Sequence, residues 1–172
     1  MYSNRMGWSS WNGNGGPTTP ANIRDTAARL QSLGLRDLGY VHVDVDGAWY
    51  PFVKDGPPPE PRPAGGWKPG GWDMKALADD LHAGGFKLGL YATAGFKAVY
   101  GHEDVWATVL FEEWGADSAN IDHVRRTLVC IFFISTSSRR IHSRWCRVRL
   151  WCSDVQCSCV RECSGRAEPV GH

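Results

Sequence analysis

A change in composition near residue 123 limits how much of this 172-residue chain one regular fold can use. Eighteen of the 20 glycines lie in residues 1–123, whereas all six cysteines lie in residues 124–172. The first part carries ten basic and fifteen acidic side chains, and the second carries nine arginines, no lysine and three acidic side chains. We therefore expect two segments of different composition, 1–123 and 124–172, and not one domain of uniform composition.

Residues 1–123 alternate short β-prone runs with segments of helical periodicity. A Pro at the first helical position, Pro20 after Thr19, begins a helix that Gly34 ends. Asp73 is the predicted N-cap of a second helix ending near Gly84, and a third helix is predicted over 104–114. The intervening apolar runs predict strands at 6–8, 40–46, 86–91 and 117–122.

This β-α-β-α-β-α-β order predicts a parallel sheet covered by helices. One helix per crossover is typical of α/β proteins, either as a doubly wound sheet or as part of a (β/α)8 barrel. In both architectures the loops that follow the strands gather at one edge of the sheet and form the site.

Residues 124–172 show no comparable order. Arginine alternates with Trp, Cys and Val, but no Gly or Pro marks a turn between Val124 and Ser164. A basic arm that binds nucleic acid is one interpretation, because Arg and Trp can combine phosphate contacts with stacking. A zinc site is another, although the cysteine spacing lacks paired C-x2-C knuckles. The interpretation favoured is an irregular, frame-shifted or otherwise aberrant extension that does not bind nucleic acid.

No segment predicts a membrane anchor or a secretion signal. The longest apolar run, Leu128 to Ile134, is far shorter than the roughly 18 to 20 residues that a membrane helix requires. The first residues, Met1 to Gly7, lack the charged-then-apolar layout of a secretory signal. We expect no membrane partner.

Carboxylates and aromatic rings follow the four predicted strands. Trp11 follows the first strand, Asp44, Asp46 and Trp49 lie at the end of the second, Tyr91 follows the third, and Asp122 ends the fourth. Sugars offer hydroxyls to carboxylates and C–H faces to Trp, and glycoside cleavage uses two carboxyl groups. The pattern predicts a carbohydrate site, with turn-forming Asp and core Trp as the alternative. Nucleotide binding is disfavoured, because the glycines at 13–16 fit neither a P-loop nor G-x-G-x-x-G.

Several motifs in residues 5–123 resemble glycoside hydrolase family 27, the retaining α-galactosidases and α-N-acetylgalactosaminidases. They occur in the family's order: Met6-Gly7-Trp8-Ser9-Ser10-Trp11-Asn12, Leu38-Gly39-Tyr40 to Asp46 and Trp49, Lys75-Ala76-Leu77-Ala78-Asp79, Gly85 to Tyr91, Gly101-His102-Glu103 and Trp114-Gly115-Ala116-Asp117. The resemblance implies the N-terminal half of a (β/α)8 barrel, about four β/α units, followed by the irregular tail.

The resemblance also implies roles for individual residues. Asp122 matches the family's nucleophile, and Trp11, Asp46 and Tyr91 match positions that line the sugar subsite. Asn120 stands in this subsite where the family usually has Lys. Gly47 likewise stands where the family usually has a second Asp. The resemblance implies hydrolysis of a terminal α-galactoside or a related pyranoside, and these departures predict a preference for a different pyranoside. No metal or organic cofactor is expected, because two carboxyl groups supply the nucleophile and the proton transfer.

The length of the chain separates it from an intact enzyme of this family. A complete barrel takes about 250 residues, and the resemblance ends after four strands. No residue matches the family's acid/base, and Asp154 has no family motif around it. We expect impaired hydrolysis, with a non-catalytic carbohydrate-binding remnant as the alternative. We also expect self-association through open edges at the first and fourth strands and through apolar surface left uncovered. Members of the family are often secreted or lysosomal, and the sequence leaves the compartment open.

Overall fold

The structure, a computed structural model, describes residues 5–15, 18–49, 59–93, 102–122, 140–141, 144–152 and 156–163. The first half of the chain contains four strands in parallel order: β1 (Gly7–Ser9), β2 (His42–Val45), β3 (Lys87–Thr93) and β4 (Ser118–Asp122). Each strand pairs with the next, with Val43 opposite Trp8 and Leu88 opposite Val43. The predicted β/α alternation is confirmed, and each strand lies within a few residues of its predicted position.

The crossover helices begin and end where the sequence predicted. Helix α2 (Pro20–Ser32) has Thr19 as its N-cap, whose hydroxyl accepts the Asn22 N–H at 3.2 Å. Helix α3 (Met74–Ala83) has Asp73 as its N-cap, with the Ala76 N–H donating to its carboxylate at 3.0 Å. A short 3-10 turn, η2 (Pro69–Gly71), precedes α3. The helix predicted over 104–114 is α4 (Glu103–Ala107), continued by the π-helical η3 (Thr108–Glu113).

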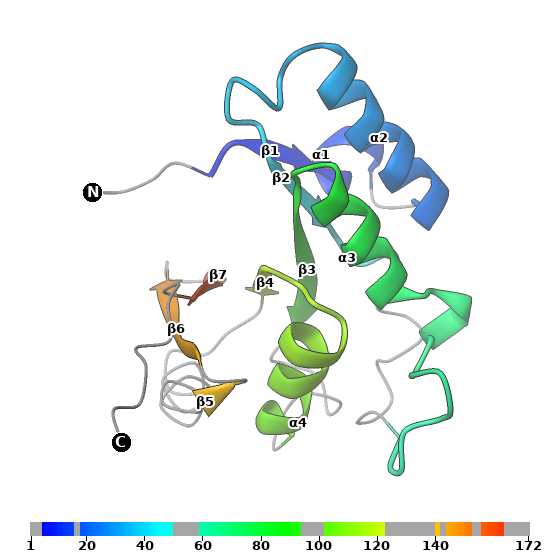
Figure 1. Ribbon diagram of the computed structural model, residues 1–172, viewed down its shortest axis with the longest axis vertical. Coiled ribbons are helices and arrows are strands. Elements are labelled where there is room, and N and C mark those ends of the chain that lie inside the picture. The colour runs from blue at the N-terminus through cyan, green and yellow to red at the C-terminus, as the bar shows by residue number, and fades with distance from the viewer. Residues whose placement is uncertain are drawn as a thin grey trace, which may run out of the picture.

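The outer face of the parallel sheet forms the apolar core. Helices α2, α3 and α4 follow one another along one side of the strands (Figure 1). The strand residues on this face are fully buried, with at most 1% of their surface exposed: Val43, Val45, Leu88, Leu90 and Ala119. Because successive strand residues alternate between faces, these five positions define the side that the helices cover.

The inner face is polar over the same strands. His42 and Asp44 on β2, Gly89 on β3 and Ser118 on β4 occupy the alternate positions. The exposed large hydrophobic residues of the described part lie in turns or outside the sheet: Met6, Trp11, Leu33, Leu38 and Tyr40. The expected uncovered apolar surface is therefore wrong for this face, because its residues are mostly hydrophilic.

Four tryptophans join the loops around α4 to the core. Trp49, Trp67, Trp106 and Trp114 have ring centroids 5.5–6.4 Å apart, in tilted or edge-to-face arrangements. Such geometry is favourable for aromatic pairs. Trp49, predicted to follow the second strand at the site, is fully buried, so the alternative that it belongs to the core holds for this residue.

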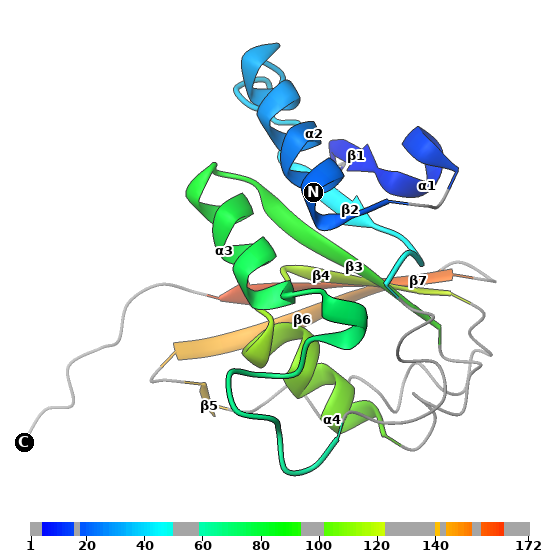
Figure 2. The same ribbon diagram turned by 90° about the vertical axis from the view of Figure 1, so that its right-hand side faces the viewer.

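The tail contains strands where an irregular segment was expected. Strands β5 (Arg140–Ile141), β6 (Arg144–Cys152) and β7 (Gln156–Cys163) extend the sheet in the order β1-β2-β3-β4-β7-β6-β5. Figure 2 shows β4, β7 and β6 running side by side, and all the pairings beyond β4 are antiparallel. The predicted boundary at residues 123 and 124 and the residue Asp154 lie outside the described residues.

The edge of β4 is therefore covered, which corrects the expectation that the fourth strand is open. Asp122 stands opposite Gln156, and Ser118 opposite Val160. An open edge leaves a row of backbone donors and acceptors unpaired, and a neighbouring segment rich in Val, Trp and Cys can satisfy them. Among the described strands, β1 lies at one end of the sheet and pairs only with β2, and the open edge expected at the first strand stays a prediction.

Candidate functional site

Trp11 lies directly after β1. It belongs to the short helix α1 (Ser10–Asn14), where 61% of its surface is exposed. Gly15 ends α1 in the left-handed conformation, with φ of 68°, and its N–H donates to the Trp11 carbonyl at 3.0 Å. Because Gly adopts positive φ at little cost, the glycine-rich sequence after Trp11 closes α1 within five residues. The indole is thus displayed to solvent beyond the end of β1.

Asp46 follows β2 and is held to the segment that carries Trp11. Its backbone N–H donates to the Ser10 hydroxyl at 2.8 Å, and Ser10 is fully buried. Its own carboxylate accepts the N–H of Gly47 at 2.7 Å. A buried hydroxyl that loses its partner is costly, so this bond fixes the end of β2 against the start of α1. Ser10 belongs to the sequence motif around Trp11, but nothing in the sequence singles it out as a contact of Asp46.

Tyr91 and Asn120 are neighbours in the sheet. They stand opposite each other in the parallel pairing of β3 with β4, and both are half-buried. A Cβ atom added at Gly47 would lie 3.9 Å from the Tyr91 ring, which places the loop after β2 over this ring. The structure therefore brings the backbone next to Asp46, the Tyr91 ring and the strand position of Asn120 into one neighbourhood.

Asp122 is the last residue of β4. In register it stands opposite Thr93, the last residue of β3. Its backbone thus lies at the carboxyl-terminal edge of the parallel strands, the same edge at which Asp46 and Trp11 follow β2 and β1. The roles of Trp11, Asp46, Tyr91, Asn120 and Asp122 stay predictions, because position alone does not test a role.

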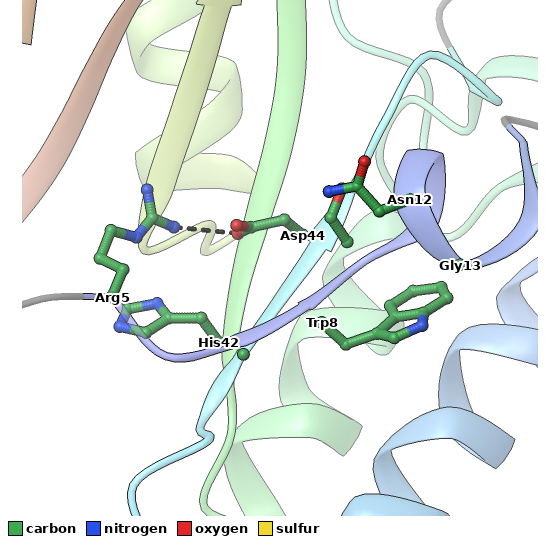
Figure 3. Close-up of a pocket in the computed structure, with 8 residues that line it drawn as sticks. Arg5, Trp8, Asn12, Gly13, His42 and Asp44 are labelled. Carbon is green, nitrogen blue, oxygen red and sulfur yellow. Dashed lines mark hydrogen bonds and ion pairs between the residues drawn. The ribbon is translucent and has the colours of Figure 1, made fainter.

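A polar cluster around Asp44 crosses the inner face, and the sequence did not reveal the partners of this carboxylate. One terminal nitrogen of Arg5 (Nη2) donates to Asp44 Oδ1 at 2.9 Å and to Ser118 Oγ at 2.6 Å. Figure 3 shows the Arg5 guanidinium facing the Asp44 carboxylate, with His42 beside it. The Asp44 carboxylate lies over Gly89, where an added Cβ would stand 1.9 Å from Oδ1. The cluster thus ties Arg5, two residues before β1, to β2 and β4, across a glycine of β3.

Burial sets the protonation of this cluster. It raises the pKa of Asp44, and the Arg5 charge opposes that rise. Burial also lowers the pKa of His42 to about 4, aided by the positive charges of Arg5 and Lys87 and opposed by Asp117. His42 is therefore neutral at physiological pH.

A cavity of about 410 Å³ adjoins the polar cluster. Arg5, His42 and Asp44 line it on one side, and Trp8 and Asn12 on the other (Figure 3). Among the predicted sugar-site residues whose side chains are described, Trp11, Asp46, Tyr91 and Asn120 do not line it. Within the described part of the chain, no group of three His, Cys, Asp or Glu residues could hold a metal ion, and no helix is long and apolar enough to cross a membrane.

Sequence comparison places this chain beside known glycosidases. Residues 19–129 match the family model described as Alpha galactosidase A. Alpha-galactosidase 3 of Arabidopsis thaliana is 36% identical over 129 residues, a match that covers 69% of this chain and 28% of that protein. The alpha-galactosidase of Coffea arabica is 36% identical over 125 residues, covering 69% of this chain and 32% of that protein. The chain thus spans less than a third of the length of these relatives.

Comparison with solved structures also shows similarity to alpha-galactosidases. Alpha-galactosidase I from Mortierella vinacea superposes with a TM-score of 0.55 and 30% identity, over 72% of this chain and 32% of that chain. The alpha-galactosidase of Saccharomyces cerevisiae superposes with a TM-score of 0.53 and 29% identity, over 69% and 26%. The prediction of a partial (β/α)8 barrel with four parallel strands is confirmed.

Proposed function

Because the chain belongs to the alpha-galactosidase family, glycoside hydrolase family 27, we propose that residues 1–123 form the N-terminal half of a retaining α-galactosidase barrel. The substrate class is a terminal α-galactoside or a related pyranoside. The reaction requires neither a metal nor an organic cofactor, because carboxyl groups supply both the nucleophile and the proton transfer. Residues 124–172 form a separate segment that contributes no catalytic group.

In this proposal Asp122 is the nucleophile. Its carboxylate attacks the anomeric carbon and forms a glycosyl-enzyme intermediate, which water then hydrolyses. Retention requires an acid/base carboxyl about 5 to 5.5 Å away, and that group belongs to the second half of the barrel. The single observation that supports the assignment most directly is the parallel pairing of β2, β3 and β4. It puts Asp46 and Asp122 at the same edge of the sheet.

The sugar subsite is proposed to form around Trp11, Asp46, Tyr91 and Asn120. The exposed indole of Trp11 offers a face for sugar C–H groups, and Asp46 offers oxygens to hydroxyls. The hydrogen bond from the Asp46 N–H to the Ser10 hydroxyl supports this arrangement, because it holds Asp46 close to the segment that carries Trp11. Preorganisation of this kind lowers the entropic cost of binding.

Gly47 leaves room over the Tyr91 ring that a side chain would fill. A Cβ there would meet the ring at 3.9 Å, an ordinary van der Waals contact. The absence of a carboxylate at Gly47 removes one hydroxyl acceptor, and Asn120 provides an amide in place of a cation. We propose that the pocket accepts a pyranoside that differs from galactose in the substituents facing these positions.

A carbohydrate-binding remnant is the second candidate. The chain spans less than a third of its curated relatives, and the family resemblance assigns none of its residues to the acid/base. Without proton transfer to the leaving group, the rate falls by about 10² to 10⁴. A remnant would keep sugar affinity and lose turnover. In both cases the proposed partner is a carbohydrate and neither a nucleic acid nor a membrane, with self-association through the edge of β1.

The test is turnover of a nitrophenyl α-galactoside by this chain alone and by the chain completed with the second half of a homologous barrel. We expect little turnover by the chain alone and measurable turnover when it is completed. Asp122→Asn should abolish the activity of the completed chain, because an amide is a far weaker nucleophile than a carboxylate. The matched control is Asp25→Asn, which changes an exposed carboxylate on α2 and should leave turnover intact.

Three outcomes separate the candidates. Activity that survives Asp122→Asn removes Asp122 from the role of nucleophile. Sugar binding by the chain alone, followed by quenching of tryptophan fluorescence, with no turnover in the completed chain, supports the binding remnant. Turnover by the isolated 172-residue chain at a level comparable to the completed one would contradict the proposal that the acid/base is missing.

A further inference from the structure

Five of the six cysteines lie on the hairpin of β6 and β7, which the proposed function does not use. Cys146 and Cys152 are on β6, and Cys157, Cys159 and Cys163 are on β7. Two strands of this length, joined by a short connection, hold their residues in a fixed register. The register therefore decides which cysteines can meet.

The pairing of β6 with β7 puts cysteine opposite cysteine at two positions. Cys146 stands opposite Cys163, and Cys152 stands opposite Cys157. The remaining cysteine of the hairpin, Cys159, stands opposite Leu150 on β6 and opposite Ala119 on β4. One matched pair lies near each end of the hairpin, six residues apart on β6.

The spacing of antiparallel strands suits a disulfide at both positions. Directly opposite residues share a face of the sheet, with Cα atoms about 4.5 or 5.5 Å apart depending on the hydrogen-bonding pattern. Disulfides span Cα separations of about 4.4 to 6.8 Å. Diagonal neighbours, such as Cys152 and Cys159, are about 7 to 8 Å apart and fall outside this range. Direct opposition thus favours two pairings over the other combinations.

We propose that the hairpin is a redox-modified site with disulfides Cys146–Cys163 and Cys152–Cys157. A small disulfide such as oxidised glutathione serves as the oxidant. One cysteine thiolate attacks it, which forms a mixed disulfide and releases one glutathione thiol. The opposite cysteine thiolate then attacks the mixed disulfide, which forms the protein disulfide and releases the second glutathione thiol. Each protein disulfide thus consumes one oxidised glutathione and yields two reduced molecules.

The two bonds would hold the strand that covers β4. Cys157 stands opposite Ile121, next to Asp122 at the carboxyl end of β4. Closing the hairpin at both ends reduces the conformations open to it when it detaches from the sheet. Oxidation would therefore keep the β4 edge paired, and reduction would release it for association with other chains.

Peptide mapping of the full chain tests the pairing. The reduced, unfolded protein is refolded with oxidised and reduced glutathione, its free thiols are alkylated, and it is digested with trypsin under non-reducing conditions. Cleavage after Arg147 and Arg161 separates Cys146 from Cys163, so their disulfide joins two otherwise distinct peptides. A further cleavage before Asp154 separates Cys152 from Cys157 in the same way.

We expect these two linked pairs, with each disulfide lowering the intact mass by two hydrogens. Cys159 shares the peptide 154–161 with Cys157, so fragmentation of the linked peptide should find Cys157 joined to Cys152 and Cys159 alkylated. Linkage of Cys159 to Cys152 or Cys163, or an even mixture of pairings, would overturn the proposal. Full alkylation of all the hairpin cysteines after refolding in oxidised glutathione would overturn it as well.

Matched serine variants give a second, independent measurement. Cys146→Ser removes a proposed disulfide, whereas Cys159→Ser changes a cysteine of the same hairpin that stands opposite Leu150 and Ala119 in register. In oxidising buffer we expect Cys146→Ser to lower the midpoint of thermal unfolding by roughly 5 °C or more relative to Cys159→Ser. With dithiothreitol the two variants should unfold alike. An equal difference in both buffers would contradict a disulfide at Cys146.

Discussion

The two faces of the parallel sheet are stabilised by different kinds of interaction. On the outer face, Val43, Leu88 and Leu90 are completely buried under the helices, so packing and the removal of apolar surface from water stabilise it. On the inner face, Arg5, Asp44 and Ser118 are joined by hydrogen bonds beside a cavity. The difference shows that half of a barrel can present a hydrophilic interior while its helices enclose a complete apolar layer.

The largest effect is expected from a change on the outer face. Leu88→Ala removes a fully buried side chain and leaves a cavity, which should lower the free energy of unfolding by about 2 to 5 kcal/mol. Urea denaturation followed by tryptophan fluorescence measures it. Leu33→Ala is the matched control, because Leu33 is 71% exposed and should change the stability by less than about 0.5 kcal/mol. Similar effects of the two changes would show that the outer face is not the main core.

A smaller effect is expected when a methyl group is added on the inner face. Gly89→Ala would put a Cβ 1.9 Å from Asp44 Oδ1 and 2.9 Å from Ser118 Oγ, so the Asp44 carboxylate must move away from Arg5. Crowding of this kind costs about 1 to 3 kcal/mol. Gly47→Ala is the control, since its nearest neighbour would be 3.9 Å away. The same urea denaturation assay measures this cost. An unchanged midpoint for Gly89→Ala would show that the polar cluster contributes nothing to the stability of the fold.

The smallest effect is expected from the pH response of the inner face. The pKa of His42 is about 4 in the folded chain and about 6.5 when unfolded, so the unfolded state binds more protons between these values. The stability due to neutral His42 is therefore complete above about pH 6.5 and is lost as the pH falls towards 4. Between about pH 6.5 and pH 4, the midpoint of thermal unfolding should therefore decrease by a few degrees less in His42→Gln than in the unchanged chain.

Asp44 provides a second test of the pH dependence of stability. Its raised folded pKa means that the folded state takes up a proton first as the pH falls, so this group makes acidification stabilising. In the Asp44→Asn variant the fall in stability at acidic pH should be steeper than in the unchanged chain. A shallower fall would show that the Arg5 charge outweighs burial at this carboxylate.

The sequence by itself determined the parallel half barrel and the order of its elements. Local signals sufficed for the helices: Thr19 and Asp73 cap α2 and α3 as predicted, because capping depends on neighbours within three residues. The buried strands could also be predicted from local sequence, since Val43 and Leu88 belong to short β-prone runs. The order of the strands also placed Trp11, Asp46 and Asp122 at one edge, because parallel strands end on the same side.

Only the tertiary structure decided the contacts between segments distant in sequence. The bonds from Arg5 to Asp44 and to Ser118 span 39 and 113 residues, and no local pattern encodes such a separation. The bond from the Asp46 N–H to Ser10 spans 36 residues in the same way. The sequence predicts an irregular tail, because no glycine or proline marks its turns. Its strands form against the edge of β4, and that edge exists only once the sheet is assembled.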